Sequence, residues 1–287
     1  MVFQDYDFLA RWAARQSRPT GLMLPLLEAV RDLVPAGGEA TLLDVGGGTN
    51  SYLVFVGGGY RKIVCDLEPR SLEGLPGVET RVAALPHTGM PSGMADWVSA
   101  CQVVEHLSPK DYEAGLQEIA RLSRRWVAIT APFYQHLESG LVKCPRCAVL
   151  YQCDGHCRAF DLGDIYRLQD FFGGLIRLGF CGVRRSWWLT RMRYRLKKVR
   201  FSLRRLGLWD YPRPPFTRCP RCGEEAFHDL AAYRARAEQD RAPKWLVPPP
   251  FTRGPVGEHF MAVFDRKALP VCQGGLWGEG GRRRPTR

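Results

Sequence analysis

The strongest constraint on the fold is an apolar run that ends in an acid and continues directly into a glycine turn, LLDVGGGTN at residues 42–50. Glycines at the end of a strand let the backbone approach a ligand closely, because they carry no β-carbon. A second apolar run ends in Asp66, about twenty residues after the glycines, a spacing suited to an acid that binds ribose hydroxyls. A plain structural turn and a dinucleotide site are the alternatives, although the order of acid and then GGGTN differs from the GxGxxG dinucleotide pattern.

From Thr41 onward, short apolar runs alternate with helical segments, the pattern of a parallel sheet built from βαβ units. The runs read TLLDV, KIVCD, DWVSACQ and RWVAIT, and two later strands are expected at Val183–Trp188 and Phe260–Phe264. The composition and the alternation together predict an α/β protein.

Sequence signals for helices occur before and between these apolar runs. Residues 1–35 carry apolar positions at helical spacing, and a further helix is expected to start near Ser51. Ser108 is a good N-cap with Pro109 behind it, and Asp161 with Asp164 has the spacing of a capping box. The helix after Asp161 is expected to present one apolar face, formed by Ile165, Leu168, Phe172 and Leu175.

The organisation of the chain follows from shifts in composition. We expect a helical cap over residues 1–40, a Rossmann-like domain over 41–190 and 256–268, a zinc-binding and basic insertion over 141–158 and 190–250, and a disordered basic tail over 270–287. The N-terminus has no secretory pattern, and no apolar run reaches the roughly 18 residues of a membrane span. A cytoplasmic location is therefore expected, with contact at the inner membrane face as a further hypothesis.

Several motifs occur together in a recognisable order: the glycine turn, ALP at 84–86, ADWVSACQVVEHL at 95–107, GHCRAF at 155–160 and LGF at 178–180. This set resembles the class I S-adenosylmethionine-dependent methyltransferases of the superfamily called type 11 or type 12, over roughly residues 40–185. The resemblance implies a Rossmann-like, seven-stranded, mostly parallel sheet with helices on both faces. It also implies S-adenosylmethionine as the cofactor and a small-molecule acceptor.

The resemblance also assigns roles to residues. Asp44 and Gly46–Gly48 would hold the methionine part, Asp66 the ribose and Leu67 one face of the adenine. The whole expected cofactor set is Asp44, Val45, Gly46, Gly47, Gly48, Asn50, Asp66, Leu67, Ala84, Leu85, Cys101 and Gln102. Two positions depart from the family pattern, because Asn50 replaces a common glycine and Arg81 stands where an acid often reads the adenine amine.

Two histidines are the candidate catalytic bases, His106 and His156, since imidazole titrates near neutral pH. A structural role beside the next helix is the alternative for His106, and metal binding is the alternative for His156.

The ten cysteines favour metal binding over disulfides in a reducing compartment. Two CPRC units place Cys144, Cys147, Cys219 and Cys222 at the spacing of zinc knuckles, which predicts a structural Zn²⁺ site with no open position. A rival local site would replace some of these thiolates with Cys153, His156 or Cys157. Cys65 and Cys101 lie in expected strands and are predicted to be packing residues.

The net charge of +12 indicates anionic partners. Basic residues interleaved with aromatics over 184–205 suit anionic lipid or nucleic-acid phosphates, and a plain solvated helix is the alternative. Because no RNA-binding module is recognised, we favour a small-molecule acceptor that is phosphorylated or lipid-linked, in the glycan, lipid-linked or secondary-metabolite classes. The alternative functions are an RNA or DNA methyltransferase and a non-catalytic, zinc-stabilised binding protein on a methyltransferase scaffold.

Overall fold

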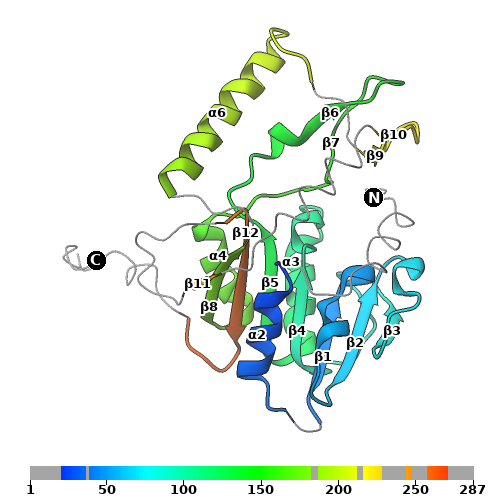
Figure 1. Cartoon of the computed structure of the whole chain (residues 1–287), viewed down its shortest axis with the longest axis vertical. Coiled ribbons are helices and arrows are strands. Elements are labelled where there is room, and N and C mark those ends of the chain that lie inside the picture. The colour runs from blue at the N-terminus through cyan, green and yellow to red at the C-terminus, as the bar shows by residue number, and fades with distance from the viewer. Residues whose placement is uncertain are drawn as a thin grey trace, which may run out of the picture.

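The computed structural model describes residues 21–36, 39–181, 187–211, 216–227, 244–246 and 257–270. An eight-stranded sheet forms its centre, in the order β11-β8-β12-β5-β4-β1-β2-β3 (Figure 1). The strands are β1 Thr41–Val45, β2 Arg61–Asp66, β3 Glu79–Val82, β4 Ala95–Cys101, β5 Ser123–Pro132, β8 Gly174–Cys181, β11 Lys244–Leu246 and β12 His259–Asp265.

Most of the sheet is parallel. β1 to β5 pair in parallel, whereas β12 runs antiparallel between β5 and β8. The seven-stranded, mostly parallel sheet expected from the sequence is therefore confirmed, with the short β11 added antiparallel at the edge beside β8. The chain leaves β1 toward β2 on one side and reaches β4 on the other, so the strand order reverses between β1 and β4. In open α/β sheets, ligands bind at such a switch point, beyond the carboxyl ends of the strands.

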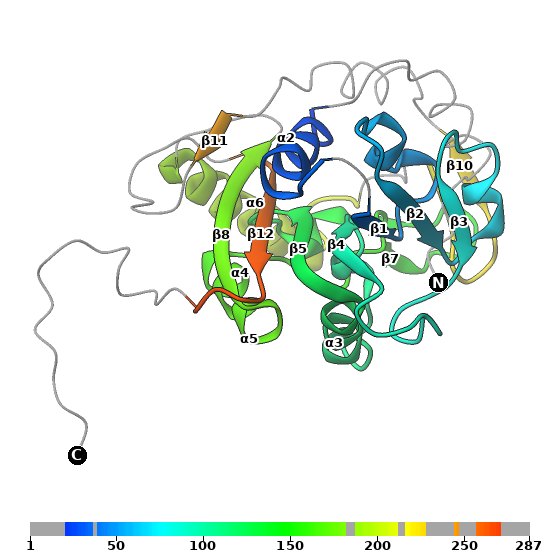
Figure 2. The same cartoon turned by 90° about the horizontal axis from the view of Figure 1, so that it is seen from below.

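Helices cover both faces of the sheet, as expected (Figure 2). On one face, α2 (Leu24–Leu33) packs with Leu42, Val64 and Trp97. On the other, α3 (Tyr112–Leu122), α4 (Leu162–Arg167) and α5 (Gln169–Phe172) pack with residues such as Leu43. Neighbouring residues of β1 thus enter opposite cores, which is the period of two that a strand imposes.

Helix boundaries differ from the sequence expectation at two places. α3 begins at Tyr112 rather than just after Ser108, because the Ser108 hydroxyl bonds the Asp111 carboxylate instead of a backbone N–H group. The helix expected near Ser51 is absent from the described chain there. Short 3₁₀ turns over Gly48–Asn50 and Tyr52–Phe55 take its place, and three consecutive glycines at 57–59 follow them.

Residues 183–186 of the strand expected at Val183–Trp188 lie outside the described residues, and Trp187 and Trp188 begin the helix α6 (Trp187–Arg205). The described strand before them is β8, Gly174–Cys181. Asp161 and Asp164 do form the predicted capping box. The helical segment ends earlier than expected, because Gly173 adopts a φ of +84° and a β-carbon there would clash with the Asp265 carbonyl. Leu175, predicted to lie on the helix, is consequently a strand residue.

An extension lies beyond the carboxyl edge of the parallel strands (Figure 1). It consists of a hairpin of β6 (Leu141–Lys143) and β7 (Leu150–Gln152), a hairpin of β9 (Phe216–Arg218) and β10 (Glu225–Phe227), and the 19-residue helix α6 (Trp187–Arg205). Tyr194 of α6 packs against Tyr134 and His136, with ring centroids 4.9 and 5.1 Å apart. No helix among the described residues is long and apolar enough to cross a membrane.

The ends of the chain, residues 1–20 and 271–287, lie outside the described residues. The first part of the helical cap and nearly all of the basic tail therefore stay predictions.

Candidate cofactor and acceptor site

The glycine turn follows β1 at the switch point, and a β-carbon at any of its three glycines would lie too close to a neighbouring side chain. Gly46 has a φ of +72°, and a β-carbon there would lie 2.5 Å from Val103 Cγ2. Its N–H donates to the Cys65 carbonyl at 2.7 Å, which ties the turn to β2. Gly48 has a φ of +47°, and a β-carbon there would lie 2.9 Å from Asp66 Oδ2. The turn thus passes directly beside the acid at the end of β2.

Asp44 lies buried beneath this turn, and the protein itself uses both of its carboxylate oxygens. Oδ2 accepts a hydrogen bond from Ser51 Oγ at 2.6 Å, and Oδ1 accepts one from Ser99 Oγ at 2.7 Å. Burial raises the pKa of Asp44 to about 6. Asp44 therefore helps to position the glycine turn through hydrogen bonds within the protein.

A hydrogen-bonded chain extends from Asp44 into the core. Trp97 Nε1 donates to the Tyr52 hydroxyl at 2.7 Å, and that hydroxyl lies 3.0 Å from Ser99 Oγ. All members of this network are buried, and the hydrogen bonds between them satisfy their side-chain polar atoms. The sequence analysis missed Ser51, Tyr52 and Ser99, and only the strand register that pairs Asp44 with Ser99 reveals them.

Asp66 remains partly accessible at the end of β2. Its Oδ1 accepts the backbone N–H of Glu68 at 2.9 Å, and burial raises the pKa of its carboxyl group. Leu67 next to it is 54% exposed and offers an apolar surface that would suit the face of a flat ring. Asp66 and Leu67 thus present a carboxylate and an apolar surface side by side.

The other expected cofactor residues differ in their burial and hydrogen bonding. Val45 is a core residue, and Asn50, Ala84 and Leu85 are half-buried. At the end of β4, Cys101 is half-buried and Gln102 adopts a φ of +58°. The backbone N–H and side-chain amide of Gln102 both bond Thr130 of β5, so this amide fixes the strand ends together. Arg81 is exposed on β3.

A second cluster follows immediately after β4. Glu105 and His106 form a 3₁₀ turn, and His156 comes from the segment after β7. The two imidazole rings lie 4.8 Å apart, edge to face. Ligand atoms of all three residues lie within 4.8 Å of one another. Burial lowers the pKa of His106 to about 4 and also lowers that of His156.

Glu105 is the unusual member of this cluster. Its side chain is fully buried, and neither carboxylate oxygen has a hydrogen-bond partner among the described residues. Burial raises the pKa of this carboxyl group to about 8. Sequence analysis assigned no role to Glu105, because the burial of a side chain without a hydrogen-bond partner is visible only in the folded chain.

The chain was also compared with known proteins. No family model and no curated protein matches the chain. Among solved structures, a SAM-dependent methyltransferase from Thermotoga maritima aligns over 91% of this chain and 92% of its own, with 13% identity and a TM-score of 0.48. One from Archaeoglobus fulgidus aligns over 91% and 100%, with 14% identity and a TM-score of 0.45.

The fold class is decided by the chain's own sheet. Its strand order reverses at β1, its antiparallel β12 lies between β5 and β8, and its glycine turn lies at the switch point. The chain has the class I methyltransferase fold. Within this fold, the turn at 46–48 occupies the place where the sequence resemblance put the cofactor.

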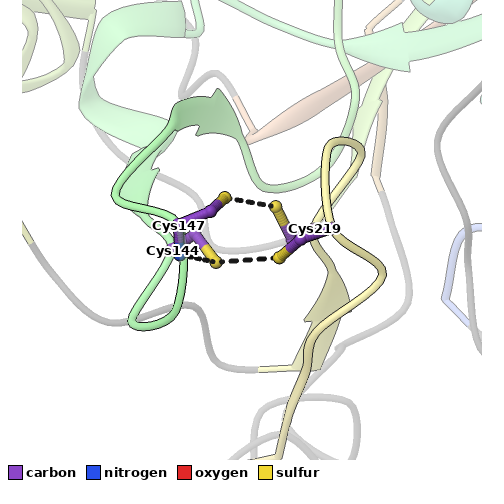
Figure 3. A group of neighbouring side chains, drawn as sticks. Cys144, Cys147 and Cys219 are labelled. Carbon is purple, nitrogen blue, oxygen red and sulfur yellow. Dashed lines mark hydrogen bonds between the residues drawn. The ribbon is translucent and has the colours of Figure 1, made fainter.

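Outside the methyltransferase sheet, the two CPRC units meet face to face (Figure 3). Cys144 Sγ lies 3.6 Å from Cys222 Sγ, and Cys147 Sγ lies 3.6 Å from Cys219 Sγ. All four sulfur atoms lie within 4.8 Å of one another, whereas the rival set with Cys153 or Cys157 is not brought together in the part of the chain described.

The two knuckles are built alike. In each, the first cysteine accepts at its carbonyl the N–H of a residue with positive φ, Ala148 in one and Gly223 in the other. The N–H groups of Arg146 and Cys147 lower the pKa of Cys144 to about 7. Turns that aim N–H groups at a sulfur favour the thiolate that Zn²⁺ binds.

Proposed function

We propose that this protein is an S-adenosylmethionine-dependent methyltransferase that acts on a small-molecule acceptor. The observation that carries the proposal is the meeting of Gly48 with the Asp66 carboxylate at the switch point, above the buried Asp44 network. A glycine turn without side chains leaves backbone exposed to an amino-acid group, and a partly accessible carboxylate suits two vicinal hydroxyls.

The residues would divide the work as follows. Asp66 accepts hydrogen bonds from the ribose hydroxyls, Leu67 covers the adenine, and the turn at 46–48 contacts the methionine part of the cofactor. Bound S-adenosylmethionine supplies a methyl group on a good leaving group, so the protein mainly has to align the acceptor and remove its proton. His106 and His156 stay the predicted groups on the acceptor side.

The surface of α6 supports a lipid-linked or membrane-associated acceptor. Trp188, Leu196 and Val199 are 65%, 56% and 56% exposed, and with Met192 they follow one another at helical spacing. Arginine and lysine residues flank this stripe. An apolar stripe with basic flanks favours an anionic bilayer. Of these four side chains only Trp188 can stack on a base, so nucleic acid is the weaker hypothesis.

We further propose that the four knuckle cysteines bind one structural Zn²⁺. Four thiolates fill a tetrahedral ion and leave no position for substrate. The ion would join two hairpins 75 residues apart in the chain, Cys144 to Cys219, and fix the extension over the sheet. Metal analysis of purified protein should give about one zinc per chain. Cys219→Ser should lose it and Cys153→Ser should retain it, and the reverse result would favour the local site.

Calorimetry with S-adenosylmethionine tests the enzymatic proposal. Wild-type protein should bind one cofactor per chain, and Asp66→Ala should weaken binding at least about tenfold, since a hydrogen bond to a charged group contributes about 1.5–3 kcal/mol. Asp170→Ala is the matched control, because Asp170 is exposed on α5, away from the switch point. No binding at millimolar cofactor by a folded wild-type protein would refute the proposal.

A further inference from the structure

We propose that Glu105, His106 and His156 bind a divalent transition-metal ion whose remaining coordination positions take an oxygen atom of the acceptor. The metal site itself stands on the geometry of these three residues, and its use in catalysis rests on the proposed methyltransferase function.

The first argument is the isolated carboxylate. Glu105 is fully buried, and both of its oxygens lack a partner within the described chain. A buried carboxyl group without a hydrogen bond or counter-charge is unfavourable, because its ionised form loses hydration and its neutral form leaves polar atoms unpaired. Neither neighbour in the cluster bonds it, although both imidazoles lie within reach of one shared ion. A cation at that point would satisfy all three groups at once.

The second argument is the support behind the His156 imidazole. His156 Nδ1 lies 2.7 Å from Gln135 Oε1, so the amide oxygen accepts the ring N–H and leaves Nε2 with a free electron pair. Metal-binding histidines almost always have such a partner on the second ring nitrogen, which fixes the tautomer and the ring orientation.

The donor set also predicts the kind of ion. Two imidazoles and one carboxylate suit Zn²⁺, Mn²⁺ or Fe²⁺, and three protein ligands leave coordination positions open. This differs from the four-thiolate site, which is closed. The chain therefore carries two metal sites of opposite character: one structural in the extension and one open beside the sheet.

The position of the cluster supports a role toward the acceptor. Glu105 and His106 follow Val103, whose side chain packs against Gly46 of the cofactor turn. The cluster therefore begins two residues after a side chain that contacts the cofactor turn. A cation there lowers the pKa of a bound hydroxyl group. The acceptor oxygen then bonds the methyl carbon as the S–C bond breaks. S-adenosylhomocysteine leaves, and the hydroxyl proton passes to water.

With the ion bound, His106 and His156 act as ligands, and the hydroxyl group needs no protein base. This predicts an acceptor class: a small molecule with a metal-binding oxygen, such as a hydroxyl group beside a second oxygen.

Full-length protein that carries one Zn²⁺ per chain, enough for the four-thiolate site only, is titrated with Mn²⁺ and followed by the free-ion EPR signal to test the open site. Mn²⁺ ranks lowest in affinity among these ions and does not displace Zn²⁺ from thiolates, so it reports the open site alone. Wild-type protein should bind one Mn²⁺ per chain. Glu105→Gln and His156→Gln should each weaken binding at least about tenfold, the usual scale for a lost ligand contact. His87→Ala, which removes an exposed histidine elsewhere, should change nothing.

Binding of S-adenosylmethionine to the same variants separates this inference from the proposed function. The variants should retain cofactor affinity, which also shows that they fold. If wild-type protein binds no Mn²⁺ up to millimolar concentration, or if both variants bind it as well as wild type, the metal site is refuted. Mn²⁺ binding without cofactor binding would keep the metal site and refute the methyltransferase.

Discussion

Gly46 offers the sharpest quantitative test of the cofactor turn. Gly46→Ala places an L-residue at a φ of +72°, which costs about 1–2 kcal/mol. The new β-carbon would also lie 2.5 Å from Val103 Cγ2, an overpacking that costs about 1–3 kcal/mol. We therefore expect the free energy of unfolding to fall by about 2–5 kcal/mol, measured by urea denaturation.

Gly74 provides a matched control for the free-energy cost of the positive φ alone. Gly74 has a φ of +69°, and a β-carbon there would meet no atom within 4 Å. Gly74→Ala should therefore lose only about 1–2 kcal/mol. In a double-mutant cycle, Val103→Ala should remove the clash and give a favourable coupling of about 1–3 kcal/mol with Gly46→Ala. The argument is wrong if Gly46→Ala and Gly74→Ala cost the same, or if the coupling is zero.

Three further predictions concern other parts of the molecule. The folded pKa of Asp44, about 6, exceeds its ordinary 3.8. The contribution of Asp44 to the free energy of unfolding is therefore fully present below pH 3.8 and is lost as the pH rises through 6. The loss is about 3 kcal/mol in urea titrations of wild type against Asp44→Asn, and parallel curves would contradict it. Leu196→Glu should abolish sedimentation with phosphatidylserine vesicles, whereas Leu269→Glu, at a residue 87% exposed elsewhere, should not. Equal retention by both variants would exclude α6 as the contact. Ala148→Gly should raise stability by about 0.5–1 kcal/mol, because Ala148 has a φ of +58°; a lower melting temperature would oppose that.

Local patterns in the sequence were sufficient for the main features of the fold. β1, β2 and β12 were predicted within a residue of their ends, because each is a short apolar run bounded by turn residues. β8 was not predicted, because Ile165, Leu168, Phe172 and Leu175 keep helical spacing, and the sequence does not show the positive φ of Gly173 that ends the helix. The position of β8 depends on its pairing with β12, whose residue Asp265 lies 92 residues after Gly173. No local sequence pattern contains that pairing.

The candidate site divides in the same way. The glycine turn, Asp66 and the CPRC units are contiguous motifs, so their residue types reveal them. The Asp44–Ser99 bond joins residues 55 positions apart and depends on the register of β1 against β4. Glu105 is adjacent to a predicted histidine, yet its chemical interest comes from complete burial without a partner among the described residues. That property arises from packing of the whole methyltransferase fold.

The most direct test of the central claim is a crystal structure of the protein with S-adenosylmethionine at saturating concentration. The account predicts the methionine part against the backbone of residues 46–48 and both ribose hydroxyls within hydrogen-bond distance of the Asp66 carboxylate. A cofactor bound elsewhere, or a crevice between these residues that stays filled by side chains, would contradict it.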